Sequence, residues 1–191
     1  QYVVHLPARF DPAERLPLLI DLGDFGELAR DRQTASELGP LSDQQGFVLV
    51  TAQADGATAQ WNVTSAKGRP DDVAFLRAIV EQLDKRLCID PARISITGMG
   101  NGAQMAGAFV CQASDLVSAV VMVAGSATTQ PCRVSERLAV LITVFDDDTV
   151  LPPTGGFGPG LQAALGPAQG VLAGGLPDPP SAEASVAAWA Q

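Results

Sequence analysis

The segment spanning residues 94–105 constrains the fold of this chain more than any other. An apolar strand at residues 94–97 leads through glycines at positions 98, 100 and 102 into a helix that we expect over residues 102–113. Closely spaced glycines permit a sharp change of direction, because glycine adopts backbone angles that other residues avoid. The sequence therefore predicts a strand, a tight corner and a helix, with Gly100 at the corner.

Strand and helix patterns alternate along the rest of the chain. Nearly continuous apolar runs at residues 16–22 and 46–52 are typical of strands buried on both faces of a parallel sheet. The remaining expected elements are strands at 2–6, 117–124 and 138–145 and helices at 34–45 (broken at Gly39 and Pro40), 73–87 and 184–190. This alternation predicts an α/β fold with a mainly parallel sheet and helices on both faces. We expect the functional site at the carboxyl edge of the strands.

Composition and charge limit the classes of protein to which the chain can belong. Its 191 residues, of which 47% are apolar and 17% charged, predict one globular domain over residues 1–191, with a loop region rich in glycine and proline at residues 151–181. A net charge of -9 repels phosphate backbones, so we expect no nucleic-acid partner. The longest apolar stretch, residues 116–127, is too short to span a bilayer as a helix.

Residues that could bind a metal or a cofactor are few. The three cysteines, Cys88, Cys111 and Cys132, allow one disulfide and leave one thiol over, and they lack the CxxC spacing of zinc and redox sites. The acidic run at residues 146–148, joined by Asp24, is an alternative site for a hard cation. Three consecutive side chains cannot all point inward, however, and acidic loops are usually solvated. We therefore expect no metal and no cofactor.

The corner at Gly100 has the form Gly-x-Ser-x-Gly, the nucleophile elbow of serine hydrolases, with glycine in place of the serine. With it, the chain resembles the secreted α/β-hydrolase esterases grouped with polyhydroxybutyrate depolymerases and feruloyl or acetylxylan esterases. The resemblance implies an α/β-hydrolase-type sheet. It identifies the chain as a degenerate or truncated member, incomplete at the C-terminus and without the C-terminal strand and histidine loop. The matching pieces lie in order at residues 18–22, 46–50, 61–62, 71–76, 88–94, 101–106, 123–125 and 147–152.

This resemblance assigns roles to individual positions. The nucleophile position is Gly100, where the serine is lost, and the acid position is Asp148, in the run that matches the acid-bearing loop. The backbone N–H of Asn101 and the loop around Asp24 form the oxyanion-hole region, where the Asp24 carboxylate would oppose a developing negative charge. The catalytic histidine of the family would lie beyond Gln191, so it is absent from this sequence.

Other residues do not replace the missing groups. His5 is the single histidine, and we expect its N-terminal strand at the far edge of the sheet. Ser95 lies inside a strand, and Ser126 follows a different strand without a neighbouring base, so neither is expected to act as the nucleophile. Asn62 begins an Asn-x-Thr glycosylation pattern, which is short enough to occur by chance.

Two functional interpretations follow from these residues. The first is an esterase-family protein, with the family reaction of serine-dependent ester hydrolysis, that is impaired or inactive. The alternative is a non-catalytic binding module for a polyester, an ester of a polysaccharide or a protein partner. Candidate ligand contacts are Trp61, Met99 and Phe157, although core packing accounts for them equally well. The resemblance also implies a secreted or extracytoplasmic protein.

Overall fold

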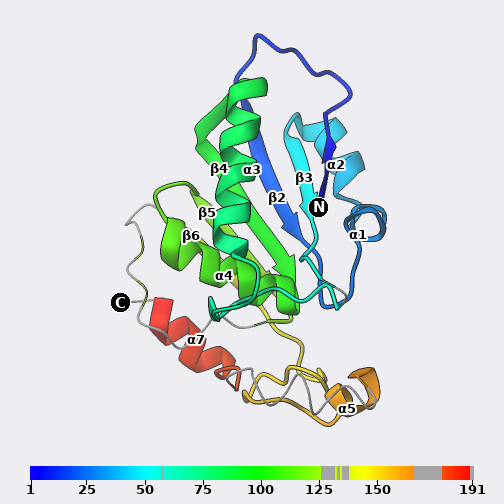
Figure 1. The fold of residues 1–191 in the computed structure, drawn as a ribbon, viewed down its shortest axis with the longest axis vertical. Helices are drawn as coiled ribbons and strands as arrows, with labels where there is room; N and C mark the ends of the chain where they lie inside the picture. Colours follow the sequence, from blue (N-terminus) through cyan, green and yellow to red (C-terminus); the bar gives the residue numbers. More distant parts are fainter. Residues whose placement is uncertain (57, 126–131, 133, 135–137, 166–177, 190–191) are drawn as a thin grey trace.

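A computed structural model describes residues 1–191 apart from positions 57, 126–131, 133, 135–137, 166–177 and 190–191. Within the described residues, one six-stranded sheet has the order β1-β3-β2-β4-β5-β6 (Figure 1). Its strands are β1 (Tyr2–His5), β2 (Leu16–Leu22), β3 (Val48–Ala52), β4 (Ile89–Met99), β5 (Ala119–Val123) and β6 (Ala139–Thr143). Only the edge pair β1 and β3 is antiparallel, which confirms the predicted mainly parallel sheet.

The central strands form the core because their apolar residues face helices on both sides. Ile20 of β2 pairs with Val50 of β3 and with Ile96 of β4, and all three side chains are fully buried. The two apolar runs that predicted doubly buried strands are therefore β2 and β3. Their carboxyl ends lie together with that of β4, because Leu22 pairs with both Ala52 and Gly98.

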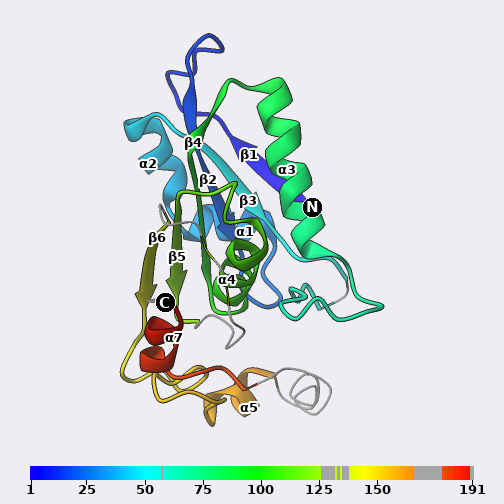
Figure 2. The ribbon, with the colours of Figure 1, turned by 90° about the vertical axis from the view of Figure 1, so that its left-hand side faces the viewer.

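Helices cover both faces of the sheet, as predicted. Those of the described residues are α1 (Ala29–Ala35), α2 (Leu38–Gln45), α3 (Asp72–Arg86), α4 (Asn101–Ala113), α5 (Gly160–Leu165) and α7 (Ala182–Trp189). Helices α3 and α4 pack on one face, and α1 and α2 pack on the other (Figures 1 and 2). The segment that follows β6, coloured yellow to red, lies beyond the carboxyl ends of the strands (Figure 1). No helix in the described ranges is both long and apolar enough to span a membrane.

The prediction of a helix over residues 34–45 is wrong about where the helix begins and about where it breaks. It is two helices, and α1 begins at Ala29. The chain breaks at Ser36 and Glu37, where Glu37 has a left-handed φ of 53°, and not at Gly39 and Pro40. Pro40 instead lies in the first turn of α2, where a proline removes only an N–H that has no helical partner.

The strand expected at residues 94–97 is longer than predicted. It begins at Ile89 because that residue pairs with Leu16 at the start of β2. The register then shifts between Leu16 and Leu18, and Leu18 pairs with Ile94. At the other end of the chain, Ser181 caps the last helix by accepting a hydrogen bond from the N–H of Ala184 (3.1 Å), and α7 begins at Ala182, before the expected start at residue 184.

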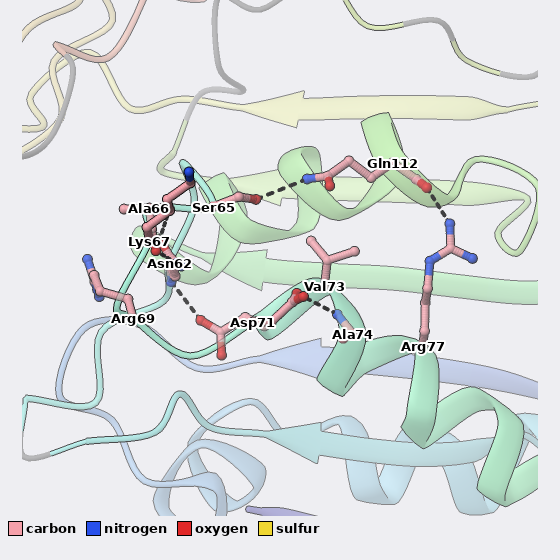
Figure 3. A pocket seen from close by; sticks show the side chains of 11 residues that line it. Asn62, Ser65, Ala66, Lys67, Arg69, Asp71, Val73, Ala74, Arg77 and Gln112 are labelled. Carbon is pink, nitrogen blue, oxygen red and sulfur yellow. Dashed lines mark hydrogen bonds between the residues drawn. The ribbon is translucent and has the colours of Figure 1, made fainter.

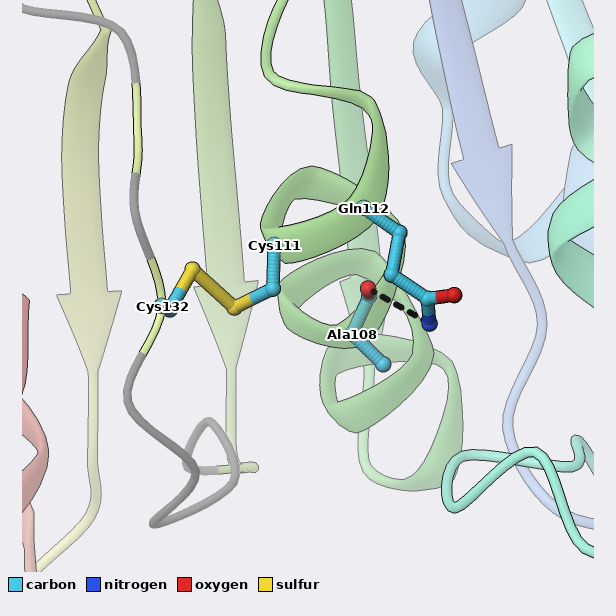
Figure 4. Close-up of a disulfide and its surroundings, with 4 residues drawn as sticks. All are labelled: Ala108, Cys111, Gln112 and Cys132. Carbon is cyan, nitrogen blue, oxygen red and sulfur yellow. Dashed lines mark hydrogen bonds between the residues drawn. A yellow bond between two sulfur atoms is a disulfide. The ribbon is translucent and has the colours of Figure 1, made fainter.

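One disulfide joins Cys111, in the last turn of α4, to Cys132 in the segment between β5 and β6 (Figure 4). It ties the helix that follows the corner to a neighbouring connection of the sheet. Cys88 is the free thiol and is partly buried. The count of three cysteines allowed one bridge without predicting it or its partners, and the structure joins Cys111 to Cys132.

Candidate active site

The corner between β4 and α4 has the geometry that its glycines predict. Gly100 stands between the two elements with φ 54° and ψ -118°, angles that favour glycine, and its N–H donates to the carbonyl of Val123 (2.9 Å). A Cβ added at Gly102 would lie 2.4 Å from the carbonyl oxygen of Leu22. The start of α4 therefore packs directly on the end of β2, and residue 100 lies at the carboxyl edge of the central strand.

Asp24, in the loop after β2, places its carboxylate against this corner. Its Oδ1 accepts hydrogen bonds from the backbone N–H of Asn101 (2.7 Å) and from the backbone N–H of Phe25 (2.7 Å). A Cβ added at Gly100 would lie 2.2 Å from the same oxygen. The carboxylate thus occupies the space in which a side chain at position 100 would begin, and it takes the N–H expected to serve an oxyanion.

The surroundings of Asp24 disfavour its charge overall. Burial raises the pKa of the Asp24 carboxyl, and the hydrogen bonds from Asn101 and Phe25 oppose that shift without cancelling it. Glu27 adds to the rise, and its Oε2 accepts the backbone N–H of Asp24 (2.9 Å). Arg32 acts in the opposite direction. The carboxylate at the corner is held by directed hydrogen bonds and not by a neighbouring cation in direct contact.

The guanidinium of Arg32 instead forms an ion pair with Asp21. The pair is bidentate, with Nε to Oδ2 and Nη2 to Oδ1 both at 2.9 Å, and the Asp21 side chain is fully buried. Nη1 also lies 3.8 Å from the sulfur of Met99. This pair fastens α1 to β2, the strand that leads into the loop carrying Asp24. The sequence did not predict this pair: Asp21 lies in the matching piece at residues 18–22, but no pattern pointed to Arg32 as its partner.

Trp61 and Asn101 hold the loop and the corner together. The Asn101 Oδ1 accepts the backbone N–H of Trp61 (2.8 Å), and the indole Nε1–H of Trp61 donates to the carbonyl of Gly23 (2.8 Å). Trp61 is fully buried and does not line the cavity beside Gly100, so it is a structural link and not the ligand contact considered above. Met99 and Phe157 do line that cavity.

This cavity, of about 380 Å³, brings the predicted site positions together. Asp148 reaches it from the loop after β6, and its Oδ1 accepts the N–H groups of Val150 (2.8 Å) and Leu151 (2.9 Å). The Asp148 carboxylate therefore already accepts hydrogen bonds from the backbone of the turn in which it lies. The lining residues combine apolar side chains with amides and the two acids: Asp24, Phe25, Gln60, Met99, Gly100, Asn101, Gln104, Ala124, Asp148, Val150, Leu151, Phe157 and Leu161.

The other candidate groups lie away from the corner or outside the described residues. His5 is on edge strand β1 as expected, and its Nε2 lies 2.9 Å from Oδ1 of Asp43. Ser95 is in the interior of β4, paired with Leu19 and Ala119. Ser126 falls outside the described residues. In the described part of the chain, no three acidic, histidine or cysteine side chains are arranged to hold a metal ion.

A second cavity, of about 470 Å³, lies at the start of α3 and is lined mainly by polar residues (Figure 3). Asn62 borders it with its side chain already engaged. Its Nδ2 donates to the carbonyls of Ala66 (3.1 Å) and Pro70 (2.9 Å), while its Oδ1 accepts the N–H of Ala66 (2.8 Å). The glycosylation pattern at this asparagine therefore falls on a buried structural residue.

The chain is similar in sequence to known esterases. No family model matches the chain. It is 27% identical over 162 residues to a probable feruloyl esterase C of Aspergillus clavatus, covering 83% of this chain and 58% of that protein. It is 28% identical over 160 residues to feruloyl esterase C of Emericella nidulans, covering 82% and 57%. The chain thus spans less than two-thirds of the length of these curated relatives.

Solved structures agree on the fold. A thermostable esterase matches with a TM-score of 0.63 at 18% identity, covering 79% of this chain and 44% of that one. The acetyl xylan esterase from Aspergillus awamori matches with a TM-score of 0.60 at 16% identity, covering 71% and 49%. The expected α/β-hydrolase-type fold is confirmed. In sequence the chain is similar to feruloyl esterases, and in fold it is similar to solved esterase structures.

Proposed function

We propose that this chain is a non-catalytic member of the esterase family, which keeps a ligand cavity at the carboxyl edge of its sheet and does not hydrolyse esters efficiently. The observation that carries the proposal is at the corner. Gly100 has no hydroxyl to attack an ester, and the Asp24 carboxylate accepts the Asn101 N–H on which an oxyanion would depend.

The rest of the chain supports the same conclusion. A serine nucleophile needs an imidazole within hydrogen-bond reach, and the one histidine in these 191 residues is His5, bonded to Asp43 on the far side of β2 and β3. Losing members of a Ser-His-Asp triad lowers kcat by roughly 10⁴ to 10⁶ in proteases. Because the nucleophile position is Gly100, a histidine supplied by further chain would have no hydroxyl to activate.

Hydrolysis of p-nitrophenyl butyrate and methyl ferulate tests this proposal. We expect the purified protein to release product no faster than buffer does. Asp148→Asn is the diagnostic variant, because it alters the acid position without touching Gly100 or Asp24. A rate above background that survives repurification and falls in Asp148→Asn would contradict the proposal.

The cavity itself supports binding of an ester-bearing ligand: a simple ester, a polyester or an acylated polysaccharide. Its apolar wall, which includes Met99, Phe157 and Leu161, suits an acyl or aromatic group, and amides at Gln60 and Gln104 can orient a polar end. The test is retention on polyhydroxybutyrate granules and on feruloylated xylan.

Two matched variants locate any retention. Leu161→Asp adds a charge to the cavity, whereas Val186→Asp adds the same charge to an exposed position on α7 outside it. We expect retention to fall only in Leu161→Asp. Equal retention by both variants would place binding elsewhere, and no retention of the unaltered protein on either material would exclude these ligand classes.

We also propose an extracytoplasmic location. The support is the Cys111–Cys132 bridge, because disulfides persist mainly in oxidising compartments. Fractionation of the source cells, with the protein found inside them and its cysteines reduced, would contradict this proposal.

A further inference from the structure

The second cavity, at the start of α3, gathers positive charge in a chain that is acidic as a whole. Lys67, Arg69 and Arg77 all line it, although the chain has only 12 basic residues and a net charge of -9. Figure 3 shows Arg69 and Arg77 on opposite sides of the cavity. Its volume of about 470 Å³ is within the range of pockets that hold small organic molecules.

Two of these basic side chains lie on the loop before α3 and are not neutralised by an acid in direct contact. Lys67 is exposed and forms no hydrogen bond or ion pair within the described ranges. Arg69 donates from Nη2 to a neutral acceptor, the carbonyl of Gln60 (2.8 Å). Their charges are therefore available to an anionic ligand.

Arg77, on the second turn of α3, has a weak acidic partner. Its Nη2 donates to the carbonyl of Gln112, and the same nitrogen lies 3.7 Å from Oδ1 of Asp115. The Asp115 side chain is 73% exposed, so water screens this ion pair. A ligand carboxylate can compete with such a contact.

The two acids that line the cavity are already bonded to the backbone. Asp71 caps α3, because its Oδ1 accepts the N–H of Ala74 (2.9 Å). Asp72 is buried, and its Oδ2 accepts the N–H of Asn62 (2.6 Å). Burial raises the pKa of the Asp72 carboxyl, and Arg69 acts against that rise. Three basic groups against two acids leave the lining with a net positive charge.

The neutral part of the lining suits hydroxyl groups. The Nε2 of Gln112 lies 3.5 Å from Oγ of Ser65, a long contact that leaves both groups able to bind a hydroxyl (Figure 3). The Asn62 side chain holds the loop in shape through Ala66 and Pro70, which lowers the entropic cost of binding. No aromatic side chain is among the described residues that line the cavity. This lining favours an acidic molecule rich in hydroxyls over an apolar one.

We propose that this cavity binds an acidic saccharide, with a sugar carboxylate against the basic side chains and sugar hydroxyls against Ser65 and Gln112. The cavity adjoins the one beside Gly100, because Gln60 lines that cavity and Asn62 lines this one, and two residues of chain span at most about 7 Å. One acylated polysaccharide that carries acid groups can therefore reach both. The inference goes beyond the proposed function and does not depend on it, since the saccharide needs no ester to bind here.

Calorimetric titration of the unaltered protein with tetragalacturonic acid tests the site. We expect saturable binding of this acid and none of xylotetraose, which is neutral and has the same number of sugar rings. Inorganic phosphate should bind about tenfold more weakly or less, because it forgoes the hydrogen bonds of the sugar hydroxyls. Absence of saturable binding, equal binding of xylotetraose, or equal binding of phosphate would overturn the inference.

The two lysines of the chain provide a matched pair of variants. Lys67 lines the cavity, whereas Lys85 lies in the last turn of α3 outside it, and both are exposed. Lys67→Glu should raise the Kd for tetragalacturonic acid about three- to tenfold, because a repulsive contact replaces an attractive one. Lys85→Glu changes the net charge equally and should leave the Kd within about twofold. Equal effects of the two variants would overturn the inference.

Acetylation of lysine gives a second readout on the unaltered protein. Tetragalacturonic acid should slow the reaction of Lys67 with N-hydroxysuccinimidyl acetate and leave the reaction of Lys85 unchanged, as measured by peptide mass spectrometry. Unprotected Lys67 at saturating saccharide would contradict the site. Failure here is distinct from failure of the proposed function, because tetragalacturonic acid carries no ester and ester hydrolysis by the unaltered protein would refute only the latter.

Discussion

Replacing Gly100 by serine restores the residue type of the elbow, yet we predict that it destabilises the protein instead of activating it. The reason is the position of Asp24. A Cβ at residue 100 would lie 2.2 Å from Oδ1 and 2.4 Å from the carboxyl carbon of that side chain, well inside van der Waals contact. The serine can be accommodated only if the carboxylate leaves its two N–H donors.

The magnitude follows from two contributions. A non-glycine residue at a φ of 54° and a ψ of -118° costs about 1–3 kcal/mol. Displacing Asp24 breaks two hydrogen bonds to a charged group, each contributing about 1.5–3 kcal/mol, although the released carboxylate regains hydration. We therefore expect Gly100→Ser alone to cost roughly 3–5 kcal/mol, and to cost only the backbone contribution of roughly 1–3 kcal/mol in an Asp24→Gly background.

A double-mutant cycle measures the difference. Urea unfolding of the unaltered protein, the two single variants and the double variant should give a coupling energy of about 2 kcal/mol, within the range of about 0.5–3 kcal/mol found for residues in contact. Trp61 fluorescence is a suitable probe because that residue is buried beside the corner. Coupling below about 0.5 kcal/mol would refute the claim that Asp24 occupies the space of the residue 100 side chain.

Three further predictions concern stability. Arg32→Ala leaves the fully buried Asp21 carboxylate without its partner, so unfolding in urea should require about 3–5 kcal/mol less free energy. Reduction of the Cys111–Cys132 bridge, whose cysteines are 21 residues apart, should lower stability by about 3 kcal/mol and lower Tm in dithiothreitol, whereas Cys111→Ser should not respond to the reductant. Because burial raises the pKa of Asp24 above 3.8, the folded state retains its proton to higher pH than the unfolded state, so the unfolding free energy should fall as pH rises through that window and fall less in Asp24→Asn.

The sequence was sufficient to predict the elements that position the site. Continuous apolar runs identified β2 and β3 as buried strands, and the spaced glycines identified the corner at Gly100. Parallel strands bring their carboxyl ends to one edge, which gave the place of the site, while the family resemblance assigned Gly100 and Asp148 to it; both residues line the same cavity. These inferences depend on the spacing of apolar residues and glycines and on the order of strands and helices, all of which can be read along the sequence.

The contact between Asp24 and Asn101 could not be predicted in the same way. The residues are 77 positions apart, and their hydrogen bond depends on the side-chain conformation of Asp24 and on the path of the loop after β2. The sequence placed a carboxylate near the oxyanion region and predicted repulsion of a developing charge. It did not predict that Oδ1 would itself accept the two N–H groups. The role of Trp61 was similarly ambiguous, because an aromatic residue near a site can line the ligand cavity or pack in the hydrophobic core.

The two departures from the hydrolase pattern, glycine at position 100 and aspartate at position 24, depend physically on each other. Asp24 can reach the N–H of Asn101 only because residue 100 has no Cβ, and the N–H groups at the corner have an acceptor only because Asp24 reaches them. A corner that had lost only its serine would leave these donors without a protein partner, at a cost of roughly 1–3 kcal/mol for each buried donor. The observed arrangement satisfies them without a ligand. We therefore infer that Gly100 and Asp24 form one arrangement, in which restoring either position alone is unfavourable, and the sign of the coupling energy in the double-mutant cycle decides the matter.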